Sequence, residues 1–463
     1  MKEKKLISMQ SINPATEKNI AEYPETSQEE VHQILHNMTH AQRKWARTSL
    51  HERSAKMLQL ANLLEQNKDE YANLMTDEMG KPLSQAIGEV EKCAWVCRFY
   101  AERGPIYLED EAVPTDSDQK YIISYQPLGI ILAIMPWNFP FWQFIRHAAP
   151  SFMAGNSIIL KHASNVSGCA LAIQDLMIKA GFEDDLFRSV LLPNDKIGRL
   201  IHHPAVNGVT LTGSTRAGSS VAKQAGEALK KTVLELGGSD AYVILDDADI
   251  EHAADLCVTS RLINSGQSCI SAKRFIIMDS VYDEFREAFK EKMSAKKMGD
   301  PRELANDVGP LAREDLRDTL HKQVQKSINQ GAKLVMGGKI PDQAGFYYPP
   351  TILENVEPGM AAFDEELFGP VAAFTRVNTE EGAISVANNS IYGLGAAVFT
   401  KDVKRGQEIA SRRLEAGCCV VNEIVKSDPR LPFGGIKQSG YGRELAREGI
   451  REFVNIKSVV VSR

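Results

Sequence analysis

One cysteine of this chain lies where a nucleophile could be activated. Cys269 ends the segment Asn264-Ser-Gly-Gln-Ser-Cys269, a polar turn that contains a glycine. A cysteine near the free backbone N–H groups of such a turn can have a lowered pKa and be partly thiolate. The alternative is a buried structural thiol, which is the commoner role of a cysteine. The turn alone leaves both interpretations open.

Two polar residues in or after apolar runs could assist a nucleophile. Glu235 is the single carboxylate of Val233-Leu-Glu-Leu-Gly-Gly238, and burial would raise its pKa toward the range of a general base. Asn138 follows the apolar run that ends at Trp137, where its amide could donate a hydrogen bond to a developing oxyanion. The alternatives are a solvated edge strand for Glu235 and a turn beside two prolines for Asn138.

A glycine-containing turn is a candidate phosphate site. An apolar strand, Val209 to Leu211, leads into Thr212-Gly-Ser-Thr-Arg-Ala-Gly218, and a helical stretch follows. Glycines permit close backbone approach, and the N–H groups at a helix N-terminus attract an anion. Ser214 could add a hydroxyl donor. An ordinary strand-to-helix turn with a Ser or Thr cap explains the segment equally well.

Other signatures of cofactor or metal binding are missing from the sequence. There is no Walker A or HExxH pattern, and the ten histidines show no zinc spacing, so no metal site is predicted. The segment Gly440-Tyr-Gly442-Arg-Glu-Leu445 lacks the third glycine of a dinucleotide fingerprint and precedes no strand–helix–strand unit. We therefore expect no phosphate loop there.

The elements that must position these residues follow from hydrophobic periodicity. Ser27 and Glu30 form a capping box before a helix that runs through Trp45. Two further helical patterns, 53–79 and 84–103, are separated by Pro82. From Tyr121 the chain alternates short strands with helices, which indicates a mostly parallel sheet. The strand candidates are 121–125, 129–135, 157–161, 188–192, 209–212 and 232–236.

A second alternating series begins after Gly237-Gly238. Its strand candidates are 241–245, 274–278, 333–336, 371–376, 396–400 and 419–422. Segment 121–125, although in the first list, fits neither series, and neither does segment 457–462. We expect both to pair outside the core sheets, in an association element.

Composition narrows the class of protein. A chain of 463 residues suggests about three domains at about 150 residues each. The net charge of −6, with no dominant Lys/Arg block, argues against binding to nucleic acid or to an anionic membrane. The longest apolar run, 129–137, is about half of the ~20 residues that a membrane span needs. Seven scattered cysteines and the lack of an apolar signal segment favour a cytoplasmic location.

The candidate residues occur together, in an order that resembles the NAD(P)-dependent aldehyde dehydrogenase superfamily over the whole chain. Within it, Phe433 to Glu444 and Leu160 to Ala163 look most like bacterial succinate-semialdehyde dehydrogenases. The resemblance rests on seven segments: Pro136-Trp-Asn-Phe-Pro140, Gly155-Asn156 with Lys161, Leu211-Thr-Gly-Ser214, Leu234-Glu-Leu-Gly-Gly238, Gly266-Gln-Ser-Cys269, Glu366-Leu-Phe-Gly-Pro370 and Pro432-Phe-Gly-Gly435.

The resemblance implies a cysteine-dependent oxidation of an aldehyde. Cys269 would attack the carbonyl carbon, and the Asn138 amide with the Cys269 N–H would hold the oxyanion. Hydride would pass to the nicotinamide, and Glu235 would activate the water that hydrolyses the thioester.

The resemblance also implies a bound NAD or NADP. Lys161 would reach the adenine-ribose hydroxyls, and Gly213 with Ser214 the pyrophosphate. Ser164 stands where many NAD-preferring members have Glu, so NADP should be tolerated. The remaining predicted cofactor contacts are Pro136, Trp137, Gly218, Leu236, Glu366 and Phe368, of which Glu366 and Phe368 would contact the nicotinamide ribose.

For the substrate, the resemblance favours succinic semialdehyde, with Arg146 and Ser427 holding its distal carboxylate. Ile263 departs from the pattern, because some members have Arg there; the nearest arginine is Arg261. Ser271 replaces a second cysteine found in some relatives, which removes a local disulfide with Cys269. Another small or medium aldehyde remains an alternative.

The expected fold is α/β and aldehyde dehydrogenase-like, with two doubly wound parallel-sheet domains, Rossmann-like in the cofactor domain, and a small β oligomerisation element. We assign residues 1–118 and 138–237 to the dinucleotide-binding domain, 238–441 to the catalytic domain, and 119–137 with 442–463 to the oligomerisation element. A homodimer or homotetramer is expected by analogy. A CoA-acylating enzyme, which Glu235 disfavours, and a non-catalytic dinucleotide-binding relative are the competing hypotheses.

Overall fold

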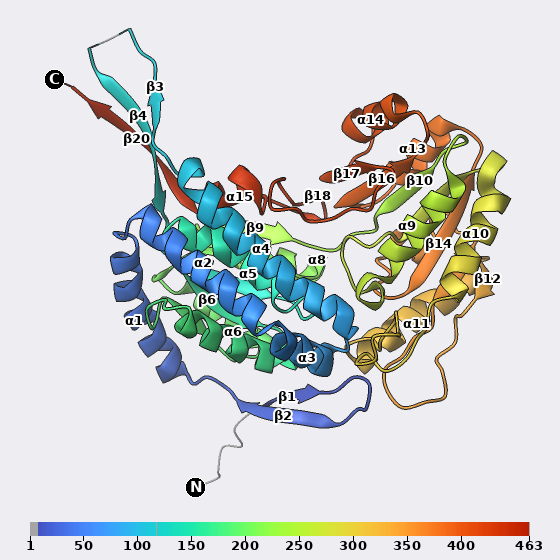
Figure 1. Ribbon diagram of the computed structural model, residues 1–463, viewed down its shortest axis with the longest axis horizontal. Helices are drawn as coiled ribbons and strands as arrows, with labels where there is room; N and C mark the ends of the chain where they lie inside the picture. Colours follow the sequence, from blue (N-terminus) through green and yellow to red (C-terminus); the bar gives the residue numbers. More distant parts are fainter. Residues whose placement is uncertain (1–7, 117, 463) are drawn as a thin grey trace.

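The computed structural model describes residues 8–116 and 118–462 and has two lobes, each built on one large sheet (Figure 1). The first lobe contains a six-stranded sheet in the order β19-β9-β8-β5-β6-β7. Strands β9, β8, β5, β6 and β7 are parallel, and the edge strand β19 is antiparallel to β9. The strands are β5 (Ile130–Met135), β6 (Ser157–His162), β7 (Phe187–Ser189), β8 (Val206–Thr212), β9 (Lys231–Glu235) and β19 (Gly440–Tyr441).

Helices cover both faces of this sheet. Successive side chains of a strand point to opposite faces, so each strand packs with both helix layers. From β5, Leu132 packs with one helix layer and Ala133 with the other. The first layer contains α1 (Gln28–Trp45), α7 (Ile197–His202) and α8 (Thr215–Glu227). The second contains α2 (Leu50–Gln66), α3 (Lys68–Met79), α4 (Leu83–Tyr107), α5 (Trp142–Met153) and α6 (Ser167–Lys179).

The second lobe contains a seven-stranded sheet in the order β12-β13-β14-β11-β10-β16-β17, parallel except for the edge strand β12. The strands are β10 (Ala241–Ile244), β11 (Arg274–Met278), β12 (Lys333–Met336), β13 (Thr351–Glu354), β14 (Val371–Val377), β16 (Gly395–Phe399) and β17 (Cys418–Val421). Its helices are α9 (Ile250–Leu262), α10 (Tyr282–Ser294), α11 (Glu314–Asn329), α12 (Ala361–Asp364), α13 (Glu380–Asn388) and α14 (Val403–Arg412). The α/β class with two parallel sheets is therefore confirmed.

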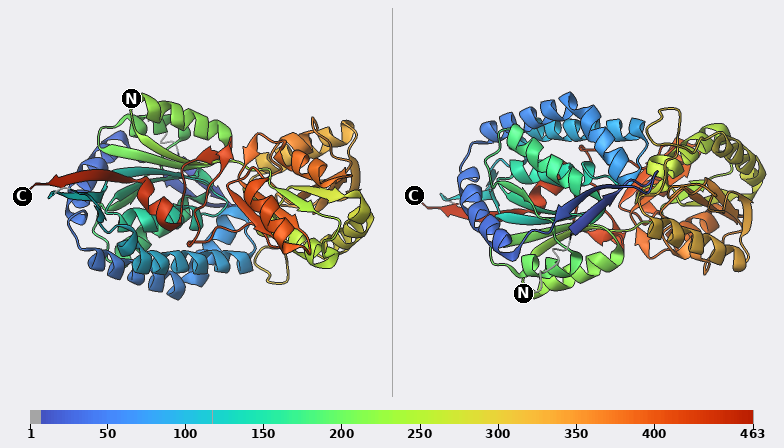
Figure 2. Two further views of the ribbon diagram at one scale, coloured as in Figure 1. Left: turned by 90° about the horizontal axis from the view of Figure 1, so that it is seen from above. Right: turned by 90° about the horizontal axis from the view of Figure 1, so that it is seen from below.

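A small antiparallel sheet projects from the first lobe (Figures 1 and 2). It consists of β3 (Glu111–Val113), β4 (Lys120–Pro127) and β20 (Val454–Val461). β20 pairs with β4 along its whole length, from Val454 opposite Pro127 to Val461 opposite Lys120. The two segments that fitted neither strand series thus lie outside the large sheets, as predicted, and the structure shows that they pair with each other.

The strand pairing differs from the expected division of the chain at two places. β5 lies within the six-stranded sheet between β6 and β8, although 119–137 was assigned to the oligomerisation element. Its six residues are all buried, which suits a central strand and not a projecting one. β19, within the segment 238–441, returns to pair with β9 of the first lobe.

Helix and strand boundaries also differ from the expected ones. The segment 53–79 forms two helices, α2 and α3, separated at Asn67, whose backbone is not helical. The predicted capping box is present, with Ser27 and Glu30 exchanging hydrogen bonds at the start of α1. The elements not predicted are β3, β13 and β19 above, β1 (Ser8–Ile12), β2 (Asn19–Pro24), β15 (Tyr392–Gly393), β18 (Ile436–Lys437) and α15 (Ala446–Glu452). No helix in the described ranges is both long and apolar enough to cross a bilayer.

Candidate active site

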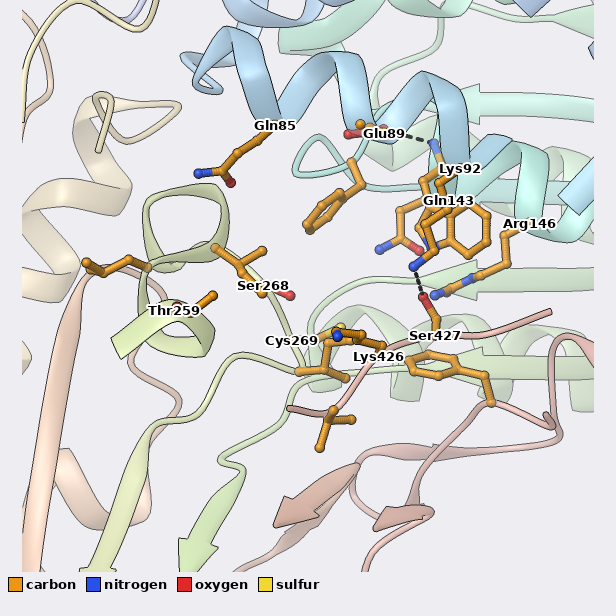
Figure 3. Close-up of a pocket in the computed structure, with 18 of the residues that line it drawn as sticks. Gln85, Glu89, Lys92, Gln143, Arg146, Thr259, Ser268, Cys269, Lys426 and Ser427 are labelled. Atoms are coloured by element: carbon orange, nitrogen blue, oxygen red, sulfur yellow. Dashed lines mark hydrogen bonds between the residues drawn. The ribbon is translucent and has the colours of Figure 1, made fainter. Parts of the chain in front are cut away.

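A cavity of about 450 Å³ is lined by residues of both lobes (Figure 3). Helices α4 and α5 of the first lobe contribute Glu89, Lys92 and Arg146. The second lobe contributes Cys269 and the segment Val425–Ser427. All seven cysteines lie in the described part of the chain, and Cys269 is the one that lines this cavity.

The loop before Cys269 has an unusual backbone. Asn264 and Ser265 have φ angles of 53° and 56°, and Gly266 has a φ of 78°. Left-handed conformations are costly for residues other than glycine. A Cβ on Gly266 would lie 2.3 Å from the backbone of Gly369, so only glycine fits. These three buried residues fix the direction in which the chain approaches Cys269.

Two buried cations hold the loop by its carbonyl groups. The Lys273 Nζ donates to the carbonyl oxygens of Ser268, Cys269 and Ser271 at 3.0, 2.8 and 3.1 Å. Arg261 donates to the carbonyl of Gly266 at 2.6 Å. Arg261 is therefore part of the loop's support and does not line the cavity, whereas Ile263 does.

The prediction of a lowered pKa for Cys269 is wrong. Burial raises the pKa of this thiol to about 12, although Arg146 and Lys273 oppose the rise. The turn supplies N–H groups, but removal of water from the sulfur outweighs them. Cys269 nevertheless keeps a small exposed surface at the cavity, whereas Cys257 is fully buried. The other five cysteines lie in helices α4 and α6 or in strand β17, as expected for structural thiols: Cys93, Cys97, Cys169, Cys418 and Cys419.

Asn138 contacts the nucleophile loop directly. The side-chain Nδ2 of Asn138 donates to the backbone carbonyl of Gln267 at 3.1 Å. The backbone carbonyl of Asn138 accepts from the Asn264 Nδ2 at 2.6 Å. The side chain is buried. One amide hydrogen remains for an oxyanion, because an amide nitrogen has two donors. The alternative of a local turn residue does not account for these contacts between lobes.

Glu235 is the last residue of β9 and is buried, so the alternative of a solvated edge strand is wrong. Burial raises its pKa well above the ordinary value, and the Glu444 carboxylate raises it further, while Arg146 opposes both effects. The Glu235 carboxyl group packs against Gly434, since a Cβ at Gly434 would lie only 2.6 Å from the Glu235 Oε1. Gly434 directly follows Phe433, which lines the cavity.

Arg146 and Ser427, the predicted substrate contacts, both line the cavity. Arg146 forms a buried ion pair with Glu444, and its guanidinium lies 4.8 Å from the centre of the Phe433 ring. Ser427 accepts a hydrogen bond of 2.8 Å from the Lys92 Nζ. The structure therefore brings the two predicted residues together.

The candidate phosphate site lies at the carboxyl ends of β8 and β6. The Ser214 hydroxyl accepts the Ala217 N–H at 3.3 Å and caps α8, which confirms the cap. The first N–H groups of a helix have no partner within it, so a cap does not exclude an anion. Lys161 is buried at the end of β6 and donates to Asn194. No carboxylate within the described ranges forms an ion pair with it, and Ser164 in the next turn is exposed.

Glycine packing shapes the neighbouring backbone. A Cβ on Gly218 would lie 2.5 Å from the Leu236 side chain, so Gly218 allows α8 to pack closely on the end of β9. Gly213, between β8 and Ser214, donates its N–H to the carbonyl of Glu235 at 3.0 Å. The turn is thus tied to the strand that carries the candidate base.

A third group of predicted cofactor contacts connects this turn with the nucleophile loop. Glu366 accepts the Gly238 N–H at 2.9 Å and lies 3.8 Å from the Lys273 ammonium. Burial raises the pKa of Glu366. The rings of Trp137 and Phe368 meet edge to face with centroids 5.7 Å apart, and Pro136 precedes Trp137 at the end of β5.

Three charged residues of this region were not predicted from the sequence: Lys92, Lys273 and Glu444. Lys273 directly precedes an apolar strand, and a buried charge at that place was a detectable signal. Lys92 occupies one face of α4 with Gln85 and Glu89, and only the packing of α4 against α5 places that face at the cavity. Glu444 belongs to the site because it forms an ion pair with Arg146, and no local sequence pattern predicts that pair.

Comparison with known proteins matches residues 1–459 to the aldehyde dehydrogenase family. A succinate semialdehyde dehydrogenase of Escherichia coli, described as using NAD(P)+, is 46% identical over 449 residues, which cover 97% of both chains. An NADP(+) succinate-semialdehyde dehydrogenase of Mycobacterium avium is 44% identical, covering 97% of this chain and 96% of its own.

Solved structures give the same result. The structure of Gox0499 has a TM-score of 0.97 at 40% identity and covers 99% of this chain and 100% of its own. The succinic semialdehyde dehydrogenase of Streptococcus pyogenes, in complex with NADP+, has a TM-score of 0.96 at 38% identity and covers 98% of this chain and 100% of its own. The expected α/β, aldehyde dehydrogenase-like fold is thereby confirmed.

Proposed function

This chain belongs to the aldehyde dehydrogenase family, and we propose that it oxidises succinic semialdehyde to succinate with NADP or NAD. The observation that carries the proposal is the contact of Asn138 with the loop that brings Cys269 to the cavity, with Glu235 packed behind the cavity wall. The three residues come from separate segments, and contacts between the lobes hold them in place.

In the proposed mechanism, the Cys269 sulfur forms a bond to the aldehyde carbon and loses its proton. The raised pKa of this thiol means that deprotonation accompanies attack, and the proton passes to water. The Asn138 amide and the Cys269 N–H donate to the oxyanion that develops. A bound dinucleotide supplies an acceptor for the hydride that leaves the carbon. The product on Cys269 is a thioester.

Hydrolysis then regenerates the thiol. Glu235 takes a proton from water, the oxygen attacks the thioester carbon, and the carbon–sulfur bond breaks as the sulfur regains a proton. A buried carboxyl group with a raised pKa is suited to this exchange of protons near neutral pH. Glu235 also disfavours the CoA-acylating alternative.

The residues at the carboxyl ends of β6 and β8 fit a dinucleotide. Lys161 is a buried ammonium whose pKa burial lowers to about 8, and a hydroxyl or phosphate ligand would stabilise its charge. Gly213 and Ser214 would hold the pyrophosphate at the start of α8, and Glu366 the nicotinamide ribose. Ser164 places no carboxylate against a 2′-phosphate, which supports use of NADP. The other proposed contacts are Pro136, Trp137, Gly218, Leu236 and Phe368.

Arg146 and Ser427 are the proposed contacts of the substrate's distal carboxylate. Ile263 would then form an apolar part of the same wall. Arg261 contributes no charge to this wall, because its guanidinium donates to the Gly266 carbonyl of the loop before Cys269.

The projecting sheet supports a homodimer or homotetramer. Ile456, Val460 and Val461 of β20 are exposed apolar residues, and strands of this kind are stabilised by association. We propose that the six-stranded lobe binds the dinucleotide, that the seven-stranded lobe supplies the nucleophile, and that β3, β4 and β20 form the oligomerisation element. Seven free cysteines favour the cytoplasm.

Initial-rate kinetics would test the proposed function. Succinic semialdehyde, glutaric semialdehyde and butanal would each be assayed with NAD and NADP. We expect the highest kcat/KM with succinic semialdehyde and no requirement for CoA. Equal kcat/KM for acid-bearing and plain aldehydes would overturn the substrate assignment. Dinucleotide binding without turnover of any aldehyde would favour the non-catalytic alternative.

A further inference from the structure

Four cationic side chains line the cavity, and three of them have carboxylate partners. Arg146 pairs with Glu444, Lys296 with Asp307 at 3.0 Å, and Lys426 with Glu423 at 3.3 Å. The fourth is Lys92, for which no ion pair is found within residues 8–116 and 118–462. A half-buried ammonium without a carboxylate partner is costly unless a ligand supplies the negative charge.

The carboxylates nearest to Lys92 are used elsewhere. Glu89, one turn earlier on α4, forms a buried ion pair with Lys81 and accepts the N–H groups of Phe141 and Trp142, both at 2.9 Å. Asp428 forms an ion pair of 2.6 Å with Arg430. Neither carboxylate therefore neutralises Lys92.

Hydroxyl and aromatic groups hold the Lys92 ammonium in place. It donates to the Ser427 Oγ at 2.8 Å and lies 4.3 Å from the centre of the Trp142 ring. Because the Ser427 oxygen accepts from Lys92, its own hydrogen remains for another acceptor. Figure 3 shows Lys92, Ser427 and Arg146 gathered on one side of the cavity, away from Gln85 and Thr259.

We propose that Lys92 is the principal cationic contact of the substrate's terminal carboxylate, with Ser427 as a second donor. The proposal rests on the proposed function and refines it, because the charge of Arg146 is already balanced by Glu444. Lys92 is thus a specificity-determining residue, and Arg146, whose charge Glu444 balances, is a weaker contact that also shapes the cavity with Phe433.

Lys92→Met tests the proposal, since methionine keeps much of the side-chain length and removes the charge. We expect kcat/KM for succinic semialdehyde to fall about 10- to 100-fold, mainly through KM, as for loss of a charge-assisted hydrogen bond. The kcat/KM for butanal should change less than about 3-fold. Lys92→Arg should recover part of the preference for the acid. The control is Lys68→Met, which removes an exposed lysine paired with Glu91 on the outer side of α4.

A binding measurement separates recognition from turnover. Butyrate, a carboxylate with no aldehyde group, should inhibit butanal oxidation competitively in the wild type and at least about 10-fold more weakly in Lys92→Met. If the wild type prefers acid-bearing aldehydes and Lys92→Met keeps that preference and its butyrate inhibition, Lys92 is not the contact. If the wild type itself shows no preference, the proposed function fails instead. Lys92→Gln would replace the methionine variant if the latter lost butanal turnover through misfolding.

Discussion

The Glu444 carboxylate raises the pKa of Glu235, and the guanidinium of Arg146 acts on both groups in the opposite direction. This relationship sets the pH range in which the proposed base can work. Glu235 must be deprotonated to accept a proton, so its raised pKa moves the acidic limb of the pH profile upward.

Glu444→Gln should move that limb to lower pH. The variant removes a negative charge and leaves Arg146 free to stabilise the Glu235 carboxylate, so both changes lower the pKa of Glu235. The measurement is kcat against pH for wild type and variant under deacylation-limited conditions. An acidic limb that stays in place or moves upward would show that Glu444 does not control this group.

Cys269→Ala should reduce turnover at least about 1,000-fold, because no other thiol lines the cavity. Dinucleotide affinity, followed by fluorescence titration, should remain close to that of the wild type. Cys257→Ala is the matched control, since Cys257 is buried in the core of the second lobe. Activity in the Cys269 variant together with its loss in the Cys257 variant would disprove the assignment.

Glu235→Gln should separate the two half-reactions. Acylation should survive and deacylation should not, which predicts a burst of about one NAD(P)H per subunit followed by turnover about 100-fold slower than in the wild type. Stopped-flow absorbance at the reduced-nicotinamide band would record it. The absence of a burst, with equally slow acylation, would assign Glu235 to the first step alone.

The preference for acid-bearing aldehydes should weaken at alkaline pH. Burial lowers the pKa of Lys92 to about 8; Arg146 lowers it as well, and Cys93, Glu89 and Asp428 oppose the shift. Loss of the Lys92 proton above this pH removes the charge that attracts a carboxylate. The ratio of kcat/KM for succinic semialdehyde to that for butanal should therefore fall by up to about tenfold per pH unit above about pH 8. A ratio independent of pH up to 9.5 would contradict this assignment.

Gly266→Ala should destabilise the nucleophile loop by more than about 1 kcal/mol, because the added methyl meets the Gly369 backbone and the φ angle is positive. Thermal unfolding and kcat should both decrease. Gly226→Ala is the control, since a Cβ there has no neighbour within 4 Å among the described residues and lies in α8. That substitution should leave stability unchanged or raise it by about 0.5–1 kcal/mol.

Local signals predicted the elements well. The capping box at Ser27 fixed the start of α1, and apolar runs located β5 and β6, because their causes lie within a few residues. β13 and β19 were missed, since both depend on partners that are distant in sequence. The break at Asn67 was missed because the helical pattern continues through it.

The candidate site divides in the same way. Cys269, Asn138 and Glu235 were found because each follows or ends a recognisable segment, and the family resemblance relates the three. The sign of the Cys269 pKa shift was wrong because a turn sequence does not report how much water the folded chain removes. Lys92 and Glu444 depend on contacts between helix α4, helix α5 and the C-terminal segment, which no single window of sequence contains.

The return of the C-terminal segment to the first lobe has a consequence for biosynthesis. β19 supplies the outer neighbour of β9, and Phe453 packs against Ile131 and Val233 of the same sheet. The Phe453 carbonyl also accepts a hydrogen bond from the Asn156 side chain at 2.9 Å. On the ribosome, the lobe that emerges first therefore stays incomplete until the last residues are released, while the second lobe has all of its strands earlier. Premature termination between Gly238 and Gly440 would leave β9 without its outer neighbour, and cleavage between the lobes would not yield two independent halves.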